Sequence, residues 1–158
     1  MKIRPYRETD TEALALLFTR AVHGLAGRDY DERQLKAWAP QPPDLDFWGT
    51  RLTTVRTLVA EENSEPVGFI SYEQNGHIDL LYASPQSARQ GVASALYRET
   101  EALLLSSGIR ELFTEASTVA RPFFESRGFQ VTEEQRVELH GITFRRFGMR
   151  KVIAGHGE

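Results

Sequence analysis

The feature that most constrains this sequence is an apolar strand followed by a proline, a glycine loop and a long amphipathic helix. The strand pattern covers residues 78–83, and Ser84-Pro85 ends it because proline cannot continue a strand ladder. Apolar residues at helical spacing then predict a helix from about Gly91 to Ser107, which Gly108 ends. This segment therefore predicts a strand–loop–helix unit with a glycine where the helix begins.

A loop of this kind presents consecutive backbone N–H groups at the start of a helix, where the helix dipole favours an anion. Gly91 lets an anion approach the backbone, Ala93 and Ser94 keep the first turn small, and Arg89 can add a charge-assisted hydrogen bond. The loop has neither Gly-Lys-Ser/Thr nor GxGxxG spacing. The pattern fits a pyrophosphate site, although a lone glycine at a helix start is more often a plain cap.

The rest of the chain predicts helices first and strands later. Thr9 with Glu12, and Asp31 with Gln34, have the spacing of capping boxes at the starts of two helices. A third short helix is expected over residues 46–52. Further strands are predicted over 58–61, 67–72 and 111–116, a short helix over 121–127, and a hairpin over 129–151 that turns at His140-Gly141. The order predicts one mixed α/β (α+β) domain over residues 1–151 and a loose tail over 152–158.

Composition excludes several classes of protein. The chain has 158 residues, which is the length of one domain. It has no cysteine, which excludes disulfides, thiolate zinc sites, iron–sulfur clusters and a cysteine nucleophile. Its 19 basic and 22 acidic residues give a net charge of −3, which argues against a nucleic-acid partner.

Two further absences in the pattern set expectations. The longest apolar run, residues 13–18, is far shorter than the ~20 residues of a membrane span, and the N-terminus has no apolar signal segment. We therefore expect no membrane partner and a cytoplasmic location. The four histidines, at positions 23, 77, 140 and 156, show no HxxxH or HExxH spacing, so we expect no metal site.

Two long segments resemble the GCN5-related N-acetyltransferase (GNAT) superfamily: IDLLYASPQSARQGVASALY at 78–97 and EASTVARPFFESRGF at 115–129. Shorter segments, including QLKAWAP at 34–40, PVGFIS at 66–71 and EQRVELHG at 134–141, resemble its YafP-like branch. The resemblance implies a mostly antiparallel mixed sheet flanked by helices and splayed at an acetyl-CoA site. It also implies transfer of an acetyl group from acetyl-CoA to an amine by direct attack.

The resemblance implies positions for the cofactor. The pantetheine arm would pair with backbone at Leu81, Tyr82 and Ala83. Ser117 and Phe124 would also lie beside it, but they stand where the family has Asn and Tyr. Ala88 stands where Gln or Arg is usual, a mild departure because the grip is mostly through backbone amides. The pyrophosphate would bind a loop formed by Arg89, Gln90, Gly91, Val92, Ala93 and Ser94.

Phe124 cannot supply the proton that the family's tyrosine gives to the leaving thiolate. A thiol with a pKa near that of cysteine, ~8.5, is a tolerable leaving group without a dedicated acid. Asp79, six residues before Pro85, is the leading candidate for the base and also for an acceptor contact. His77, on the same face, is its competitor, and Tyr82 is an alternative acid.

The acceptor is expected to be a small-molecule amine, with a protein or peptide as the alternative, and the net negative charge is compatible with a cationic amine. His23 and Tyr30 flank the break between the first two helices, a region that covers the acceptor site in such folds. Tyr30 fits either a hydrophobic staple with Leu35 or an acceptor contact. Trp38, Phe47 and Trp48 fit either core packing or an apolar acceptor pocket.

Two other functions remain open at this point. A CoA-binding sensor without turnover fits the replacements Ser117 and Phe124, and a cofactor-free interaction domain fits a loop that is only a helix cap. The C-terminal hairpin can supply a dimer edge, so a monomer and a homodimer are both open.

Overall fold

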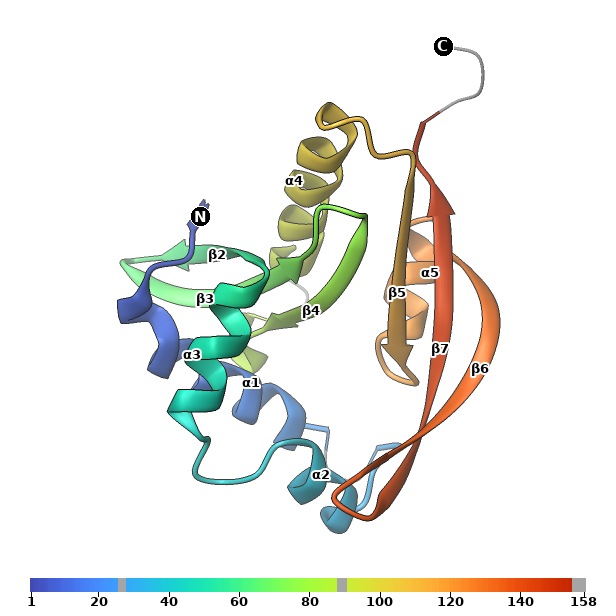
Figure 1. The fold of residues 1–158 in the computed structure, drawn as a ribbon. Helices are drawn as coiled ribbons and strands as arrows, with labels where there is room; N and C mark the ends of the chain where they lie inside the picture. The colour runs from blue at the N-terminus through green and yellow to red at the C-terminus, as the bar shows by residue number, and fades with distance from the viewer. Residues whose placement is uncertain (26–27, 88–90, 155–158) are drawn as a thin grey trace.

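The computed structural model describes residues 1–25, 28–87 and 91–154 and contains a seven-stranded sheet in the order β1-β2-β3-β4-β5-β7-β6 (Figure 1). The strands are β1 (Lys2–Pro5), β2 (Arg56–Glu62), β3 (Glu65–Tyr72), β4 (His77–Ala83), β5 (Glu111–Ser117), β6 (Gln130–Leu139) and β7 (Ile142–Val152). The helices are α1 (Thr11–His23), α2 (Glu32–Trp38), α3 (Leu45–Thr54), α4 (Val92–Ser106) and α5 (Arg121–Ser126), with 3-10 turns at Glu8–Asp10 and Pro85–Ser87.

All neighbouring strands are antiparallel except β4 and β5, which are parallel and pair only at His77↔Phe113 and Ile78↔Thr114. The two strands diverge after this short pairing, as Figure 1 shows. The predicted mixed, mostly antiparallel sheet with a splay is therefore confirmed.

The splay begins where β4 has an irregularity. Ser71 pairs with Leu80 and Tyr72 pairs with Ile78, so Asp79 is an extra residue with no partner on β3. A β-bulge of this kind bends its strand and re-aims a side chain, and such bulges are common beside active sites. The bulge at Asp79 lies directly after the last residue of β4 that pairs with β5.

Each face of the sheet carries its own apolar core. The face covered by α4 and α5, here the α4/α5 face, buries Leu96, Leu112 and Phe124 among others. The face covered by α1, α2 and α3, here the α1–α3 face, buries Leu14, Leu17 and others (Figure 1). The cavity described below extends from one core to the other through the splay.

One predicted helix start is confirmed and one is wrong. Asp31 accepts from the Gln34 N–H at 2.8 Å and Gln34 returns the bond at 2.9 Å, which is the expected capping box. The Thr9–Glu12 box does not form, because the chain makes a 3-10 turn there and α1 begins at Thr11. Asp10 instead accepts two bonds from the buried Arg4 guanidinium and one from the Arg7 N–H. Pairing the buried Arg4 and Asp10 charges is more important for stability here than a helix cap at Thr9.

The C-terminal hairpin turns at His140-Gly141 as predicted, and both residues have positive φ. β7 runs to Val152, one residue beyond the predicted domain limit, and the Ile153 N–H donates to the Arg110 carbonyl at 2.8 Å. Residues 155–158 lie outside the described residues, so the loose tail stays a prediction. Among the described helices, none has the length and apolar character to span a membrane.

Candidate active site

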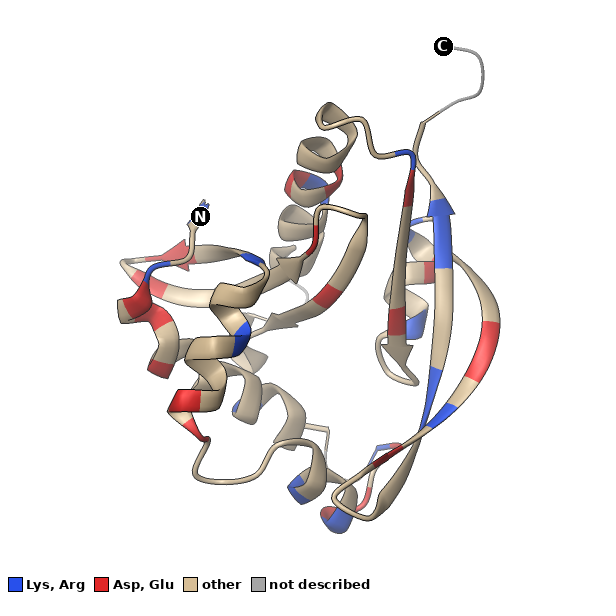
Figure 2. Ribbon diagram, viewed as in Figure 1, with Lys and Arg blue, Asp and Glu red and all other residues tan. Residues whose placement is uncertain are grey.

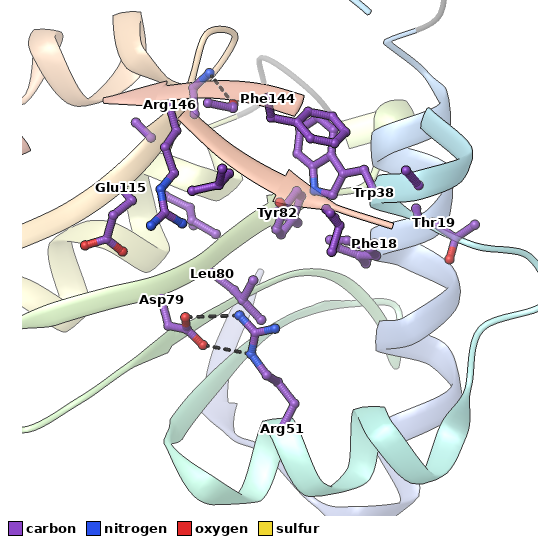
Figure 3. Close-up of a pocket in the computed structure, with 18 of the residues that line it drawn as sticks. Phe18, Thr19, Trp38, Arg51, Asp79, Leu80, Tyr82, Glu115, Phe144 and Arg146 are labelled. Carbon is purple, nitrogen blue, oxygen red and sulfur yellow. Dashed lines mark hydrogen bonds and ion pairs between the residues drawn. The ribbon is translucent and has the colours of Figure 1, made fainter. Parts of the chain in front are cut away.

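A cavity of about 650 Å³ opens where β4 and β5 diverge (Figure 3). Residues 78–82 of β4 and 114–117 of β5 line two of its sides. The α1–α3 face and the tip of the C-terminal hairpin complete it, through residues that include Phe18, Trp38, Trp48, Arg51, Phe144 and Arg146. The splay therefore continues into a pocket on the α1–α3 face.

Two cross-strand contacts hold the closed end of the splay. Thr114 Oγ1 donates to the Ile78 carbonyl at 2.8 Å, and the His77 Nε2 lies 2.7 Å from Glu115 Oε1. The other ring nitrogen of His77 lies 2.6 Å from Glu73 Oε1, and the ring stacks on Phe113. Mainly through the Glu115 bond, these carboxylates raise the pKa of His77 to about 9, against the opposing effect of burial. At neutral pH His77 is a cation with both N–H groups donated.

His77 is therefore not available to remove a proton from an acceptor. It does not line the cavity in the part of the chain that the structure describes. The His77 side chain links β4 to β5 through its contact with Glu115. This structural role disfavours the prediction of His77 as a base.

Asp79 lies on the cavity wall, but both of its oxygens are engaged. Arg51 Nε donates to Oδ2 and a terminal nitrogen of Arg51 donates to Oδ1, each at 3.1 Å, as Figure 3 shows. The Asp79 side chain is 19% exposed and that of Arg51 is 38% exposed. The bulge at Asp79 thus aims its carboxylate at α3, where a bidentate ion pair holds it.

Tyr82 also lies on the cavity wall, packed edge-on against Phe18 with ring centroids 4.8 Å apart. Burial raises the pKa of the Tyr82 phenol, and the neighbouring Trp38 and Arg51 only partly oppose this. Tyr82 is therefore a neutral phenol at neutral pH, able to donate a hydrogen bond but a weak acid.

The predicted pyrophosphate loop is described only in part, because Arg89 and Gln90 lie outside the described residues. Gly91 adopts a left-handed conformation (φ +82°), and a Cβ placed there would meet no atom within 4 Å. α4 begins at Val92, and the first of its turns to close is the bond from the Ala95 N–H to the Gly91 carbonyl. Helix geometry leaves the N–H groups of Val92, Ala93 and Ser94 without carbonyl partners inside the helix.

The remaining predicted cofactor positions fall on both sides of the splay. Leu81 lines the cavity, and Ala83 packs at the edge of the α4/α5 core on the same strand. Ser117, at the end of β5, lines the cavity and accepts from the Ala120 N–H at 3.1 Å. Phe124 lines it too, buried in α5 against Phe123 and Phe129. Of these predicted positions, Leu81, Ser117 and Phe124 lie around one opening.

Only one of the two predicted acceptor residues lines the cavity. His23 does not line the cavity; its Nε2 lies 2.8 Å from the carbonyl of Ala39, a lining residue at the end of α2. Tyr30 lines the cavity, and its buried hydroxyl has no hydrogen-bond partner among the described residues. Trp38, Phe47 and Trp48 also line the cavity, which fits the predicted apolar pocket.

Sequence reasoning missed several lining residues, among them Arg51, Glu115, Phe144 and Arg146. Alternation along β5 could have identified Glu115, because Leu112 and Ala116 are buried on the α4/α5 face and Glu115 points the other way. Arg51 and Phe144 carried no local signal, since they reach the cavity only through tertiary packing. Within the described ranges, His, Asp and Glu form no group of three or more suited to a metal ion.

Comparison with known proteins identifies the class. The acetyltransferase (GNAT) domain family matches residues 27–152. The uncharacterized N-acetyltransferase YafP of Escherichia coli strain K12 is 40% identical over 150 residues, covering 95% of each chain. A GCN5-related N-acetyltransferase from Rhodopseudomonas palustris superposes with a TM-score of 0.92 at 32% identity, over 96% of this chain and 95% of that one. PaiA N-acetyltransferase from Thermoplasma acidophilum, solved with coenzyme A, has the same fold at 20% identity (TM-score 0.77, covering 96% and 98%).

The chain belongs to the GNAT family and is an N-acetyltransferase. The family resemblance inferred from the sequence is confirmed, including its YafP-like branch. The comparisons give no support to the alternative of a CoA-binding sensor without turnover.

Proposed function

We propose that this protein transfers the acetyl group of acetyl-CoA to the amine of a small-molecule acceptor by direct attack. The observation that carries the proposal is the splay of β4 from β5, which opens into a cavity reaching both faces of the sheet. A thioester lying in the splay would meet an acceptor that enters from the α1–α3 face.

The residues around the splay fit the cofactor chemically. Beyond Ile78, the β4 edge that faces β5 has no strand partner in the described part of the chain, so its backbone groups are free to pair with an amide-bearing arm. Gly91 and the first N–H groups of α4 offer an open, electropositive cradle for a pyrophosphate. The thioester, when bound, supplies an acetyl group attached to a thiol of good leaving ability.

The protein's contribution to the reaction is placement and polarisation. Holding an amine and a thioester in contact removes much of the entropic barrier to their reaction. A free backbone N–H of the β4 edge can polarise the carbonyl, and the neutral phenol of Tyr82 can add a hydrogen bond on the same side. Asp79 remains the proposed proton acceptor only if its pair with Arg51 opens, and Phe124 leaves the thiolate without a dedicated acid.

Calorimetric titration with acetyl-CoA and with CoA tests the cofactor site. In the variant Ala93→Phe, a ring fills the first turn of α4, and we expect binding to weaken at least tenfold. Arg98→Phe places the same ring on an exposed position of the same helix and should bind like the parent. A folded parent protein that binds neither ligand would overturn the proposal, whereas binding followed by thiol release with an amine panel would establish turnover.

A further inference from the structure

Two clusters of aromatic rings form the walls of the cavity on the α1–α3 face. The Tyr30 cluster contains Tyr30, Trp38 and Phe144, with ring centroids 5.1–6.4 Å apart. The Tyr82 cluster contains Phe18, Trp48 and Tyr82, with Phe18 4.7 Å from Trp48 and 4.8 Å from Tyr82. All six residues line the cavity. Figure 3 labels four of them, Phe18, Trp38, Tyr82 and Phe144, which lie at the same end of the pocket.

The rings of these clusters form a continuous aromatic surface and not a cage around an empty centre. Centroid separations of this size mean that the rings contact one another directly, so no space for a cation remains among them. A quaternary or alkyl ammonium group is held by ring faces that converge on an empty centre. The clusters instead offer extended aromatic surfaces, against which a flat ring packs well.

The charges of the cavity do not favour a cation either. Three carboxylates, Asp44, Asp79 and Glu115, are matched by three guanidinium groups, Arg51, Arg145 and Arg146. Figure 2 likewise shows acidic and basic residues interspersed over the molecule. The net charge of −3 is therefore not concentrated where an acceptor would bind, and it gives no local support to a cationic acceptor.

The carboxylates that line the cavity are also engaged. Asp79 holds Arg51 with both oxygens, and Glu115 accepts from the His77 cation, which lowers the pKa of Glu115. Asp44 accepts from two backbone N–H groups at the start of α3. An alkylammonium ion with a pKa of ~10.4 would find no effective base among these side chains. An amine acetylated here should already be uncharged at neutral pH.

We propose that the acceptor is a weakly basic aromatic amine, whose ring packs against the two aromatic clusters while its uncharged amino nitrogen lies at the β4–β5 splay. Tyr82 belongs both to an aromatic cluster and to the strand that borders the splay, so a ring seated on it brings its amino group to that opening. The nitrogen lone pair attacks the thioester carbonyl and the C–S bond breaks. The nitrogen then loses a proton to solvent, and the departing thiolate takes up a proton from solvent. The products are the N-aryl acetamide and the free thiol of CoA. The inference rests on the proposed function.

A polar contact accompanies the apolar walls. Tyr30 is 8% exposed, lines the cavity, and carries a buried hydroxyl without a partner among the described residues. A buried unpaired hydroxyl is unfavourable unless a ligand completes it. We therefore expect the preferred aromatic amine to carry a hydrogen-bonding substituent on its ring.

Four amines separate ring recognition from basicity: aniline, benzylamine, cyclohexylamine and 2,2,2-trifluoroethylamine. We expect kcat/KM, followed by thiol release and product mass, to be at least tenfold higher for aniline than for the other three at pH 7. The aniline rate should be constant between pH 6 and 8, since its amine does not titrate there and His77 stays charged. Equal or faster reaction of benzylamine or trifluoroethylamine would overturn the inference.

Variants locate the effect in the cavity. Phe144→Leu should raise the KM for aniline five- to tenfold and leave that for trifluoroethylamine unchanged.

Tyr30→Phe should raise the KM for 4-aminoacetophenone several-fold but not that for 4-ethylaniline. The control Tyr72→Phe, which removes a hydroxyl outside the cavity, should change neither KM. Identical KM values for 4-aminoacetophenone in Tyr30→Phe and the parent would remove Tyr30 from the site.

A CoA titration of the same samples distinguishes failure of the proposed acceptor from failure of the proposed cofactor site. If CoA binds and aniline is not acetylated, the inference about the acceptor is wrong while the cofactor site stands. If CoA does not bind, the proposed function fails and this inference fails with it.

Discussion

The two faces of the sheet contribute to the cavity in different ways. On the α4/α5 face, the proposed cofactor positions that the structure describes come from short continuous segments, residues 81–83, 91–94 and 117–124, and much of their expected chemistry is that of the backbone. On the α1–α3 face, the cavity is assembled from side chains far apart in the sequence, such as Phe18, Trp38 and Phe144. Each of these three comes from a different element.

This difference explains which substitutions each face can accept. A backbone N–H donates whatever its side chain, so we expect that Ala88 can replace the residue usual in the family without loss of the backbone contacts to a pyrophosphate. An aromatic wall depends on every ring in it, because its contact surface is the sum of the rings. We therefore expect the proposed cofactor side to be common to the family, and the proposed acceptor side to decide what this protein acetylates.

Truncating one core leucine on each face should give the largest effects. Leu96 of α4 and Leu14 of α1 are both fully buried. Each change to alanine should lower the free energy of unfolding by about 2–5 kcal/mol, measured by urea denaturation, because it leaves a cavity. Leu96→Ala should also weaken CoA binding with little effect on the acceptor KM, and Leu14→Ala should do the reverse.

Enough folded protein for this comparison can be secured by working at low temperature with CoA present, since a bound ligand adds to apparent stability. Parallel losses of both binding properties in both variants would show that the two faces act as one unit, and the contrast drawn above would be wrong.

Titration of His77, which ties the two strands at the closed end of the splay, should give the next largest effect. Glu115 and Glu73 hydrogen-bond to the ring, Asp79 adds a longer-range attraction, and together they raise the pKa of His77 to about 9 from 6.5. Because the folded-state pKa is the higher one, this stabilisation is complete below pH 6.5 and is lost as the pH rises through about 9. The shift corresponds to roughly 3 kcal/mol at most, at about 1.4 kcal/mol per pKa unit.

The measurement is the free energy of unfolding at pH 6.0, 7.5 and 9.5 for the parent and for His77→Gln. The difference between the two proteins should shrink as the pH rises, since the variant lacks the titrating group. A difference independent of pH would mean that His77 is not charged in the folded protein.

The sequence predicted the fold better than it predicted the acceptor side of the site. The strand at 78–83, the helix that follows Gly91 and the hairpin at His140-Gly141 follow from local spacing, and all three are present. The bulge at Asp79 could not be predicted, because it depends on how β4 pairs with Ser71 and Tyr72 of a neighbouring strand.

The failed capping box at Thr9 has the same origin as the missed ion pair at Asp79. In both places an arginine decides the local structure: Arg4 engages Asp10 across a 3-10 turn, and Arg51 engages Asp79 from 28 residues away. Local patterns contain no information on which carboxylate a distant guanidinium will bind.

Releasing Asp79 should have a smaller effect on stability and a selective effect on activity. Arg51 is 38% exposed, so its pair with Asp79 contributes no more than about 1 kcal/mol, and Arg51→Met should unfold at nearly the same urea concentration. The freed carboxylate can then accept a proton, so kcat/KM for benzylamine should rise several-fold while that for aniline changes less than twofold. Combining Arg51→Met with Asp79→Asn should abolish the gain. A gain that survives Asp79→Asn would point to another base.

Phe124→Tyr should have the smallest effect, and it tests the cofactor side alone. Phe124 is 4% exposed and lines the cavity where the family resemblance places the acid. A thiol with a pKa of ~8.5 already leaves without a proton donor, so the added hydroxyl should raise kcat by no more than about threefold, equally for every acceptor. Phe123→Tyr, on the neighbouring residue outside the described cavity lining, should leave kcat unchanged. If Phe124→Tyr is folded but inactive, the ring packs where no hydroxyl fits, and the phenylalanine is then part of the site's shape rather than a lost acid.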